Sequence, residues 1–152
     1  MNNKNTVIFD LDGTLANVDA RRKLATKQNG KMDWDKFLNP DNIKLDIPNE
    51  PVIKMAQLLA EDGFNIFIFS GRSDRTINVT RSWLTRNRVP FHKLVMRGKD
   101  SLFMPDDKLK KQFLDKHADI NDVFAVFDDR QKVVDMWREN GLITFQTEKG
   151  NF

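Results

Sequence analysis

Five short apolar runs, separated by longer stretches with helical patterning, constrain the fold of this chain more than any other feature. Each run has the length and β-forming composition of a buried strand. The runs are residues 7–9, 65–69, 94–96, 123–127 and 142–145. Between them, the patterning favours helices at 49–63, at 73–88, from 106 onward and at 131–140. Consecutive parallel strands need helical crossovers of this kind, so the sequence predicts an α/β fold with a doubly wound, five-stranded parallel sheet.

Polar side chains follow directly on three of these runs. They are Asp10 and Asp12, Ser70 and Arg72, and Asp128 and Asp129. Sheets of this type bind ligands beyond the carboxyl ends of their strands. We therefore expect these side chains to share one site.

The segment from Asp10 to Thr14 carries the strongest chemical signal. Asp10 and Asp12 leave an extended chain on the same face, with Leu11 turned away between them. Two converging carboxylates repel each other unless a cation lies between them, and hard oxygen ligands suit Mg2+. Gly13 permits a sharp turn, and Thr14 adds a hydroxyl and a backbone N–H. An ordinary strand and turn is the alternative, but Asp-x-Asp-Gly-Thr arises by chance in roughly one chain per thousand of this length.

Length and composition favour one domain, spanning residues 1–152. With 39% hydrophobic and 31% charged residues the chain is typical of a globular protein, and no apolar run approaches the ~20 residues of a membrane span. The first strand begins too early to leave room for a signal peptide, which predicts a cytoplasmic protein without membrane contact. The absence of cysteine excludes disulfides and thiol chemistry within this sequence. The net charge of +3 only weakly favours anionic partners.

Residues at about 17–50 form a short insert, which we expect to lie over the site. Residues 16–30 are helix-compatible, and residues 31–51 are expected to be irregular because three prolines interrupt them. Trp34, Phe37 and Leu38 are its apolar anchors. Pinning of a long loop by Trp34 and Phe37 is favoured over base stacking. The insert is too short for a full cap domain, so the site should be open.

The segment Asp-Leu-Asp-Gly-Thr at 10–14 resembles the first motif of the haloacid dehalogenase superfamily of phosphotransferases. The resemblance implies that Asp10 is the nucleophile and Asp12 the general acid/base. By the same resemblance Ser70 binds the transferring phosphoryl group, and Mg2+ is held by the motif aspartates. The implied metal ligands are Asp10, Asp12, Asp128 and Asp129. Lys110 matches the third-motif lysine better than Lys108 or Lys111, by its spacing from Asp106.

Within this superfamily the chain is most similar to the 3'-phosphatase domain of phage-type polynucleotide kinase/phosphatase. The similar segments are 9–16, 69–72, Asp106-Asp107 with Lys110, and 128–138. The likeness implies phosphate contacts by Arg21 and Arg72 and a functional role for Asp106. Thr14 and Gly71 are further candidates for substrate binding. The chain departs from the family in a longer insert and in lacking Gly-x-x-x-x-Gly-Lys-Ser/Thr, so no kinase half is expected.

The sequence thus predicts a Mg2+-dependent phosphomonoesterase that removes 3'-phosphates from DNA or RNA ends through an aspartyl-phosphate. Its expected partners are nucleic-acid 3'-phosphate ends and a separate kinase or ligase. Two alternatives stay open at this point. One is a small-molecule phosphatase such as a 5'-nucleotidase, and the other is an inactive phosphate-binding module.

Overall fold

The predicted parallel sheet is present, with the strand order β5-β4-β1-β6-β7. The structure is a computed structural model that describes residues 3–150. The strands are β1 (Thr6–Phe9), β4 (Asn65–Ser73), β5 (Lys93–Arg97), β6 (Val123–Arg130) and β7 (Thr144–Gly150). All neighbouring strands pair in parallel. The fold class expected from the sequence is therefore confirmed.

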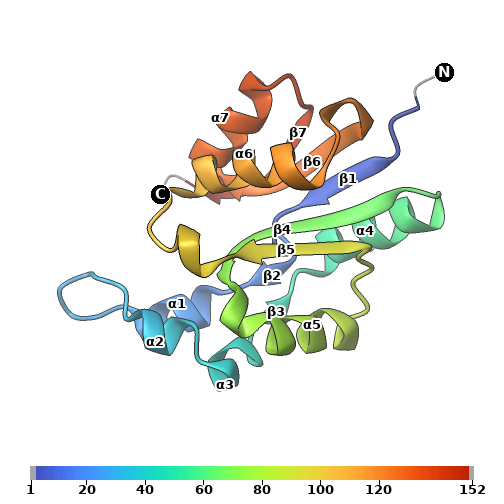
Figure 1. Ribbon diagram of the computed structural model, residues 1–152. Helices are drawn as coiled ribbons and strands as arrows, with labels where there is room; N and C mark the ends of the chain where they lie inside the picture. Colours follow the sequence, from blue (N-terminus) through green and yellow to red (C-terminus); the bar gives the residue numbers. More distant parts are fainter. Residues whose placement is uncertain (1–2, 151–152) are drawn as a thin grey trace.

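Helices cover both faces of this sheet (Figure 1). They are α4 (Glu50–Glu61), α5 (Ile77–Arg86), α6 (Asp106–His117) and α7 (Gln131–Glu139). The alternation of side chains along β1 divides the core: Val7 and Phe9 pack on the face covered by α4 and α5, and Ile8 packs on the face covered by α6 and α7. Because β1 is fully buried in the middle of the sheet, the turn that follows it has little freedom.

Two strands differ from their predicted limits. The last apolar run was expected to be a strand at 142–145, but β7 runs from Thr144 to Gly150. Leu142 is buried as part of the connection from α7, whereas the edge strand needs few apolar residues because one side of it faces solvent. β4 continues through the expected loop at 70–72 as far as Ser73. Its register with β5 shifts between Ser70 and Ser73, so this end of the strand is irregular.

The insert is more regular than the sequence suggested. It contains α1 (Asp19–Ala25), α2 (Trp34–Phe37) and α3 (Pro40–Ile43), closed by an antiparallel pair of β2 (Ala16–Asn17) and β3 (Ile47–Pro48). Asp33 and Asn39 accept backbone N–H bonds as the caps of α2 and α3. Phe37 is buried, but Trp34 is 62% exposed, so the prediction that Trp34 anchors the insert is wrong. Within residues 3–150, no helix is long and apolar enough to cross a membrane.

Candidate active site

The three polar segments predicted to share a site do meet at the carboxyl edge of the sheet. The backbone N–H of Asp10 donates to the Phe127 carbonyl of β6 at 2.9 Å, which holds the end of β1 beside the end of β6. The turn after Asp10 closes when the Gly13 N–H donates to the Ala16 carbonyl at 2.8 Å. Gly13 has a φ of +87°, and a Cβ there would lie 2.1 Å from Asp129 Oδ2. A glycine is therefore required both by the backbone and by the adjacent carboxylate.

Three buried carboxylates form the centre of this site. One oxygen each of Asp10, Asp128 and Asp129 lies within 4.8 Å of the others. Thr14 Oγ1 donates to Asp10 Oδ2 at 3.0 Å, and the backbone N–H of Asp129 donates to Asp128 Oδ1 at 2.9 Å. Hard oxygen donors at this spacing suit Mg2+, so the residues present fit the metal that the sequence predicted.

Lys110 supplies the cation among these carboxylates. It is 3% exposed on α6, and its Nζ donates to Asp10 Oδ1 at 2.6 Å and to Asp128 Oδ2 at 3.0 Å. Trp137 Nε1 also donates to Asp128 Oδ2, at 3.1 Å. Lys111, by contrast, pairs with Asp115 on the helix surface. The geometry places Lys110 where the third-motif lysine was expected, and its catalytic role stays a prediction.

The charges of this cluster are not balanced. Burial raises the pKa of Asp10 well above its ordinary value, and Asp128 and Asp129 raise it further, while Lys110 opposes them. Burial also raises the pKa of Asp129. Asp10 and Asp128 raise the pKa of Lys110 despite its burial. The cluster therefore favours the uptake of a proton or a metal ion.

Asp12 faces a different set of partners. Its Oδ1 accepts from Arg72 Nε at 2.8 Å, Arg72 Nη2 at 2.5 Å and Arg21 Nη2 at 3.2 Å. Burial alone would raise the pKa of Asp12, but the Arg72 and Arg21 guanidinium groups hold it below its ordinary value. In the part of the chain that the structure describes, Asp12 does not belong to the three-carboxylate cluster. Its predicted role as a metal ligand stays a prediction.

Asp46, from the insert, binds the same two arginines. It accepts from Arg21 Nε at 2.9 Å, from Arg21 Nη2 at 2.8 Å and from Arg72 Nη2 at 2.8 Å. Arg21, Arg72 and Asp46 are all buried. The Asp46 backbone carbonyl in turn accepts from Trp83 Nε1 at 2.9 Å. Both arginines predicted to contact phosphate are thus held in a buried ion-pair network, and their contact with substrate stays a prediction.

Sequence reasoning did not single out Asp46. It lies in a stretch without periodicity, between Leu45 and Ile47, so neither spacing nor an adjacent strand distinguished it from other surface aspartates. Only the fold of the insert brings it to Arg21 and Arg72.

A second arginine pair surrounds Asp106. Arg97 Nη2 donates to Asp106 Oδ1 at 2.5 Å, and Arg130 Nη1 binds Asp106 Oδ2. Arg97 Nε also donates to the Gly71 carbonyl at 2.9 Å, and a Cβ on Gly71 would lie 3.1 Å from Asp106 Oδ1. Ser70 Oγ accepts from the Arg72 N–H at 3.1 Å in the same loop. Arg97 was missed, although it directly follows the third apolar run and the strand-end rule could have found it.

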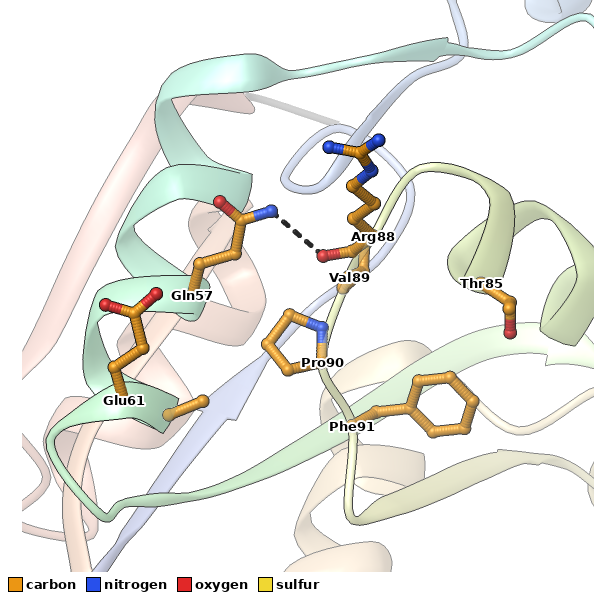
Figure 2. Close-up of a pocket in the computed structure, with 8 residues that line it drawn as sticks. Gln57, Glu61, Thr85, Arg88, Val89, Pro90 and Phe91 are labelled. Atoms are coloured by element: carbon orange, nitrogen blue, oxygen red, sulfur yellow. Dashed lines mark hydrogen bonds between the residues drawn. The ribbon is translucent and has the colours of Figure 1, made fainter.

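A surface pocket lies elsewhere, between α4 and the connection from α5 to β5 (Figure 2). It has a volume of about 430 Å³. Gln57 Nε2 donates across it to the Arg88 carbonyl at 2.9 Å. The pocket lies near the start of β5, at the amino ends of the strands, whereas the acidic cluster lies at their carboxyl ends. None of the predicted site residues lines the pocket.

Comparison with known proteins shows the family of this chain. The family model of the polynucleotide kinase phosphatase domain matches residues 4–152. The chain belongs to this haloacid dehalogenase family. A protein of Autographa californica nuclear polyhedrosis virus, provisionally described as a bifunctional polynucleotide kinase/RNA ligase, is 34% identical over 142 residues. That match covers 88% of this chain and 18% of the viral protein.

Solved structures show the same relationship. A chain in a structure of the Pnkp1/Rnl/Hen1 complex matches with a TM-score of 0.79 and 27% identity, over 98% of this chain and 47% of that chain. A haloacid dehalogenase-like hydrolase of Streptococcus pneumoniae matches with a TM-score of 0.70 over 96% of this chain and 85% of its own, but at 12% identity this likeness shows the fold alone. The chain spans less than half the length of the polynucleotide kinase relatives. The resemblance seen in the sequence is confirmed, and the chain is a haloacid dehalogenase-type phosphatase.

Proposed function

We propose that this phosphatase is Mg2+-dependent and removes 3'-phosphates from DNA or RNA ends through an aspartyl-phosphate intermediate. The observation that carries the proposal is the position of Asp10. Its carboxylate belongs to the three-carboxylate cluster, contacts Lys110 and ends the central strand. A rigid nucleophile beside a cation is what transfer of a phosphoryl dianion requires.

Asp10, Asp128 and Asp129 would hold Mg2+, which when bound neutralises charge on the phosphate and on the nucleophile. Lys110 adds a fixed positive charge in contact with both Asp10 and Asp128. These residues lie at the end of β1, at the end of β6 and on α6, so the packed core fixes their separation. The attacking anion and the phosphate dianion can then approach each other.

The chemical step uses the two aspartates in turn. An Asp10 carboxylate oxygen attacks phosphorus in line, forming an O–P bond as the bond from phosphorus to the substrate's 3' oxygen breaks. Asp12 gives a proton to that departing oxygen. Asp12 then takes a proton from the water that attacks the aspartyl-phosphate, which releases inorganic phosphate and restores Asp10. The lowered pKa of Asp12 keeps it ionised in the free enzyme. The proton that it gives to the leaving oxygen is therefore taken up from solvent when substrate binds, as the phosphate dianion offsets the positive charge of Arg72 and Arg21.

The preference for polynucleotide 3' ends is supported by the family to which the chain belongs. The printed names of the relatives also support action alongside a kinase or ligase, whether on one polypeptide or on separate ones. A small-molecule phosphatase is the competing function, since it would use the same carboxylates.

A direct assay separates these functions. The purified protein is given a 3'-phosphorylated oligonucleotide, the same oligonucleotide with a 5'-phosphate, and nucleoside 3'- and 5'-monophosphates, with Mg2+ or with EDTA. We expect kcat/KM to be highest on the 3'-phosphorylated oligonucleotide and to vanish in EDTA. The Asp10→Asn variant controls for a contaminating phosphatase. Equal or better hydrolysis of the mononucleotides would assign the chain to small-molecule substrates.

A further inference from the structure

Two exposed aromatic side chains lie at the end of the molecule where the active site opens. Phe103 is 98% exposed, the highest value for a large apolar side chain in residues 3–150. Trp34 is 62% exposed on α2. The segment between β5 and α6, which carries Phe103, and α2 both lie at the end toward which the strands point (Figure 1). The mechanism proposed above uses neither residue.

The backbone around Phe103 is held by an arginine of the site. Arg97 Nη1 donates to the Ser101 carbonyl at 2.6 Å and to the Met104 carbonyl at 2.7 Å, on either side of Phe103. The same guanidinium binds Asp106 and the Gly71 carbonyl. Phe103 precedes Asp106 by three residues, so their Cα atoms are at most about 11 Å apart. The ring is therefore presented to solvent by a segment that Arg97 ties to Gly71 and Asp106.

Trp34 is held in a similar way on the insert. Its ring packs edge-on against Phe37 with a centroid distance of 5.7 Å, and the Phe37 carbonyl accepts from Arg21 Nη1 at 2.8 Å. Arg75 pairs with Asp35, next to Trp34, at 3.6 Å. On the other side of the turn that contains Arg75, Asp74 lies beside Gly98, where the Phe103 segment begins. The short turn that follows β4, Asp74–Thr76, thus lies between the segment that carries Phe103 and the helix that carries Trp34.

We propose that Phe103 and Trp34 are stacking platforms for the nucleobases of a single-stranded 3' end whose terminal phosphate occupies the site. The inference rests on the proposed function and adds a subsite to it. Bases stack on aromatic rings whatever their sequence, which suits an enzyme that acts on ends of any sequence. Trp34 stands between Asp33 and Asp35, and Phe103 stands between Leu102, which is 52% exposed, and Met104.

The test compares two oligonucleotides of equal length and equal phosphate count. Both carry a 3'-phosphate, but in one the two terminal nucleosides are abasic. Stacking gives about 5- to 150-fold in affinity for each base. We expect wild-type KM to be lower for the base-bearing oligonucleotide. Phe103→Ala should raise that KM within this range, with little change in kcat, and should leave KM for the abasic oligonucleotide unchanged. Trp34→Ala should act in the same direction, and Phe103→Tyr should behave as wild type.

Phe124→Ala is the matched control. Phe124 is 43% exposed at the beginning of β6, at the end of the strands away from the site. Its substitution should leave both KM values unchanged. Phe103 and Trp34 are exposed, so unfolding temperatures of their variants should match wild type. The subsite would be overturned if Phe103→Ala kept the wild-type difference in KM between the two oligonucleotides, or raised KM equally for both. Wild-type protein that hydrolyses neither oligonucleotide but does hydrolyse a mononucleotide would instead overturn the proposed function.

Discussion

Asp10 and Asp12 belong to one turn, but their carboxylates lie in opposite electrostatic surroundings. Asp10 shares a buried cluster with two further carboxylates and one ammonium group, that of Lys110. Asp12 shares a network with one further carboxylate, Asp46, and two guanidinium groups. The pKa of Asp10 is accordingly raised and that of Asp12 lowered.

The comparison supports the two different chemical roles that we propose for the two aspartates of this short motif. The first cluster has an excess of negative charge, so its carboxylates repel one another until a cation binds. The packed core, rather than attraction between its own charges, holds this cluster together. The second is balanced and stabilises itself. In the proposed mechanism the nucleophile, which needs a metal, lies in the first cluster, and the residue that exchanges protons lies in the second. The two roles follow from the partners that the fold brings to each residue.

The largest expected effect is on turnover in Asp10→Asn and Asp12→Asn. Each should lose at least ~10²-fold in kcat, because one variant lacks the nucleophile and the other the proton donor. We expect the two to differ in stability without metal. A carboxyl whose folded pKa is raised loses stability as pH rises, so at pH 7 Asp10→Asn should unfold at or above the wild-type temperature. Asp12, with a lowered pKa, stabilises the fold above its unfolded pKa, and Asp12→Asn should lose about 1–3 kcal/mol.

Thermal unfolding in EDTA at pH 7, with kcat measured in Mg2+, checks both halves of this prediction. If Asp12→Asn proved the more stable variant, the assignment of the two clusters would have to be exchanged. Near-normal hydrolysis by either variant would remove that aspartate from the mechanism.

For Asp46→Asn we expect a smaller loss of activity than for Asp10→Asn or Asp12→Asn, but a large loss of stability. Its side chain is 1% exposed and pairs with both arginines, so the substitution leaves buried positive charge uncompensated. Breaking such a pair costs about 3–5 kcal/mol. Denaturant unfolding measures this, and Asp41→Asn in the same insert is the control. Asp41 is exposed and should change stability by less than about 0.5 kcal/mol. Equal stability of the two variants would show that the second cluster does not hold the insert.

The sequence revealed the first cluster better than the second for a physical reason. Strand ends are visible in a sequence because apolar runs mark them, and parallel strands bring their ends together. Asp10, Asp128 and Asp129 of the first cluster were found in this way. Asp12 and Arg72 of the second cluster were found in the same way, but Asp46 was not. Asp46 is brought to its partners by an insert whose short helices depend on capping residues and on the burial of Phe37. These helices are too short to show an apolar periodicity in the sequence. Trp34 and Phe37 are equally apolar, and only the three-dimensional structure shows that one is buried and the other exposed.

We expect pH to have a moderate effect on the affinity for Mg2+. Because the pKa values of Asp10 and Asp129 are raised, protons compete with Mg2+ for the first cluster, and affinity should increase with pH by up to about tenfold per unit for each proton displaced. Calorimetric titration in buffers of different ionisation enthalpy would detect the released protons. Asp12→Asn should keep both the affinity and this pH slope. Weaker Mg2+ binding by Asp12→Asn would make Asp12 a metal ligand after all.

The smallest expected effect concerns Lys111, which adjoins Lys110 on α6. One residue along a helix turns the side chain by about 100°, so Lys111 leaves the acidic cluster and pairs with Asp115 at 2.6 Å on the surface. Such i,i+4 pairs contribute about 0.3–0.5 kcal/mol. Lys111→Ala should therefore change kcat by less than about twofold and stability by no more than that contribution, whereas Lys110→Ala removes the one ammonium group from among three carboxylates. Assays of kcat and unfolding temperature on both variants measure the contrast. If Lys111→Ala reduced kcat as much as Lys110→Ala, α6 would have to present a different face to Asp10, and the contacts that define the first cluster would be wrong.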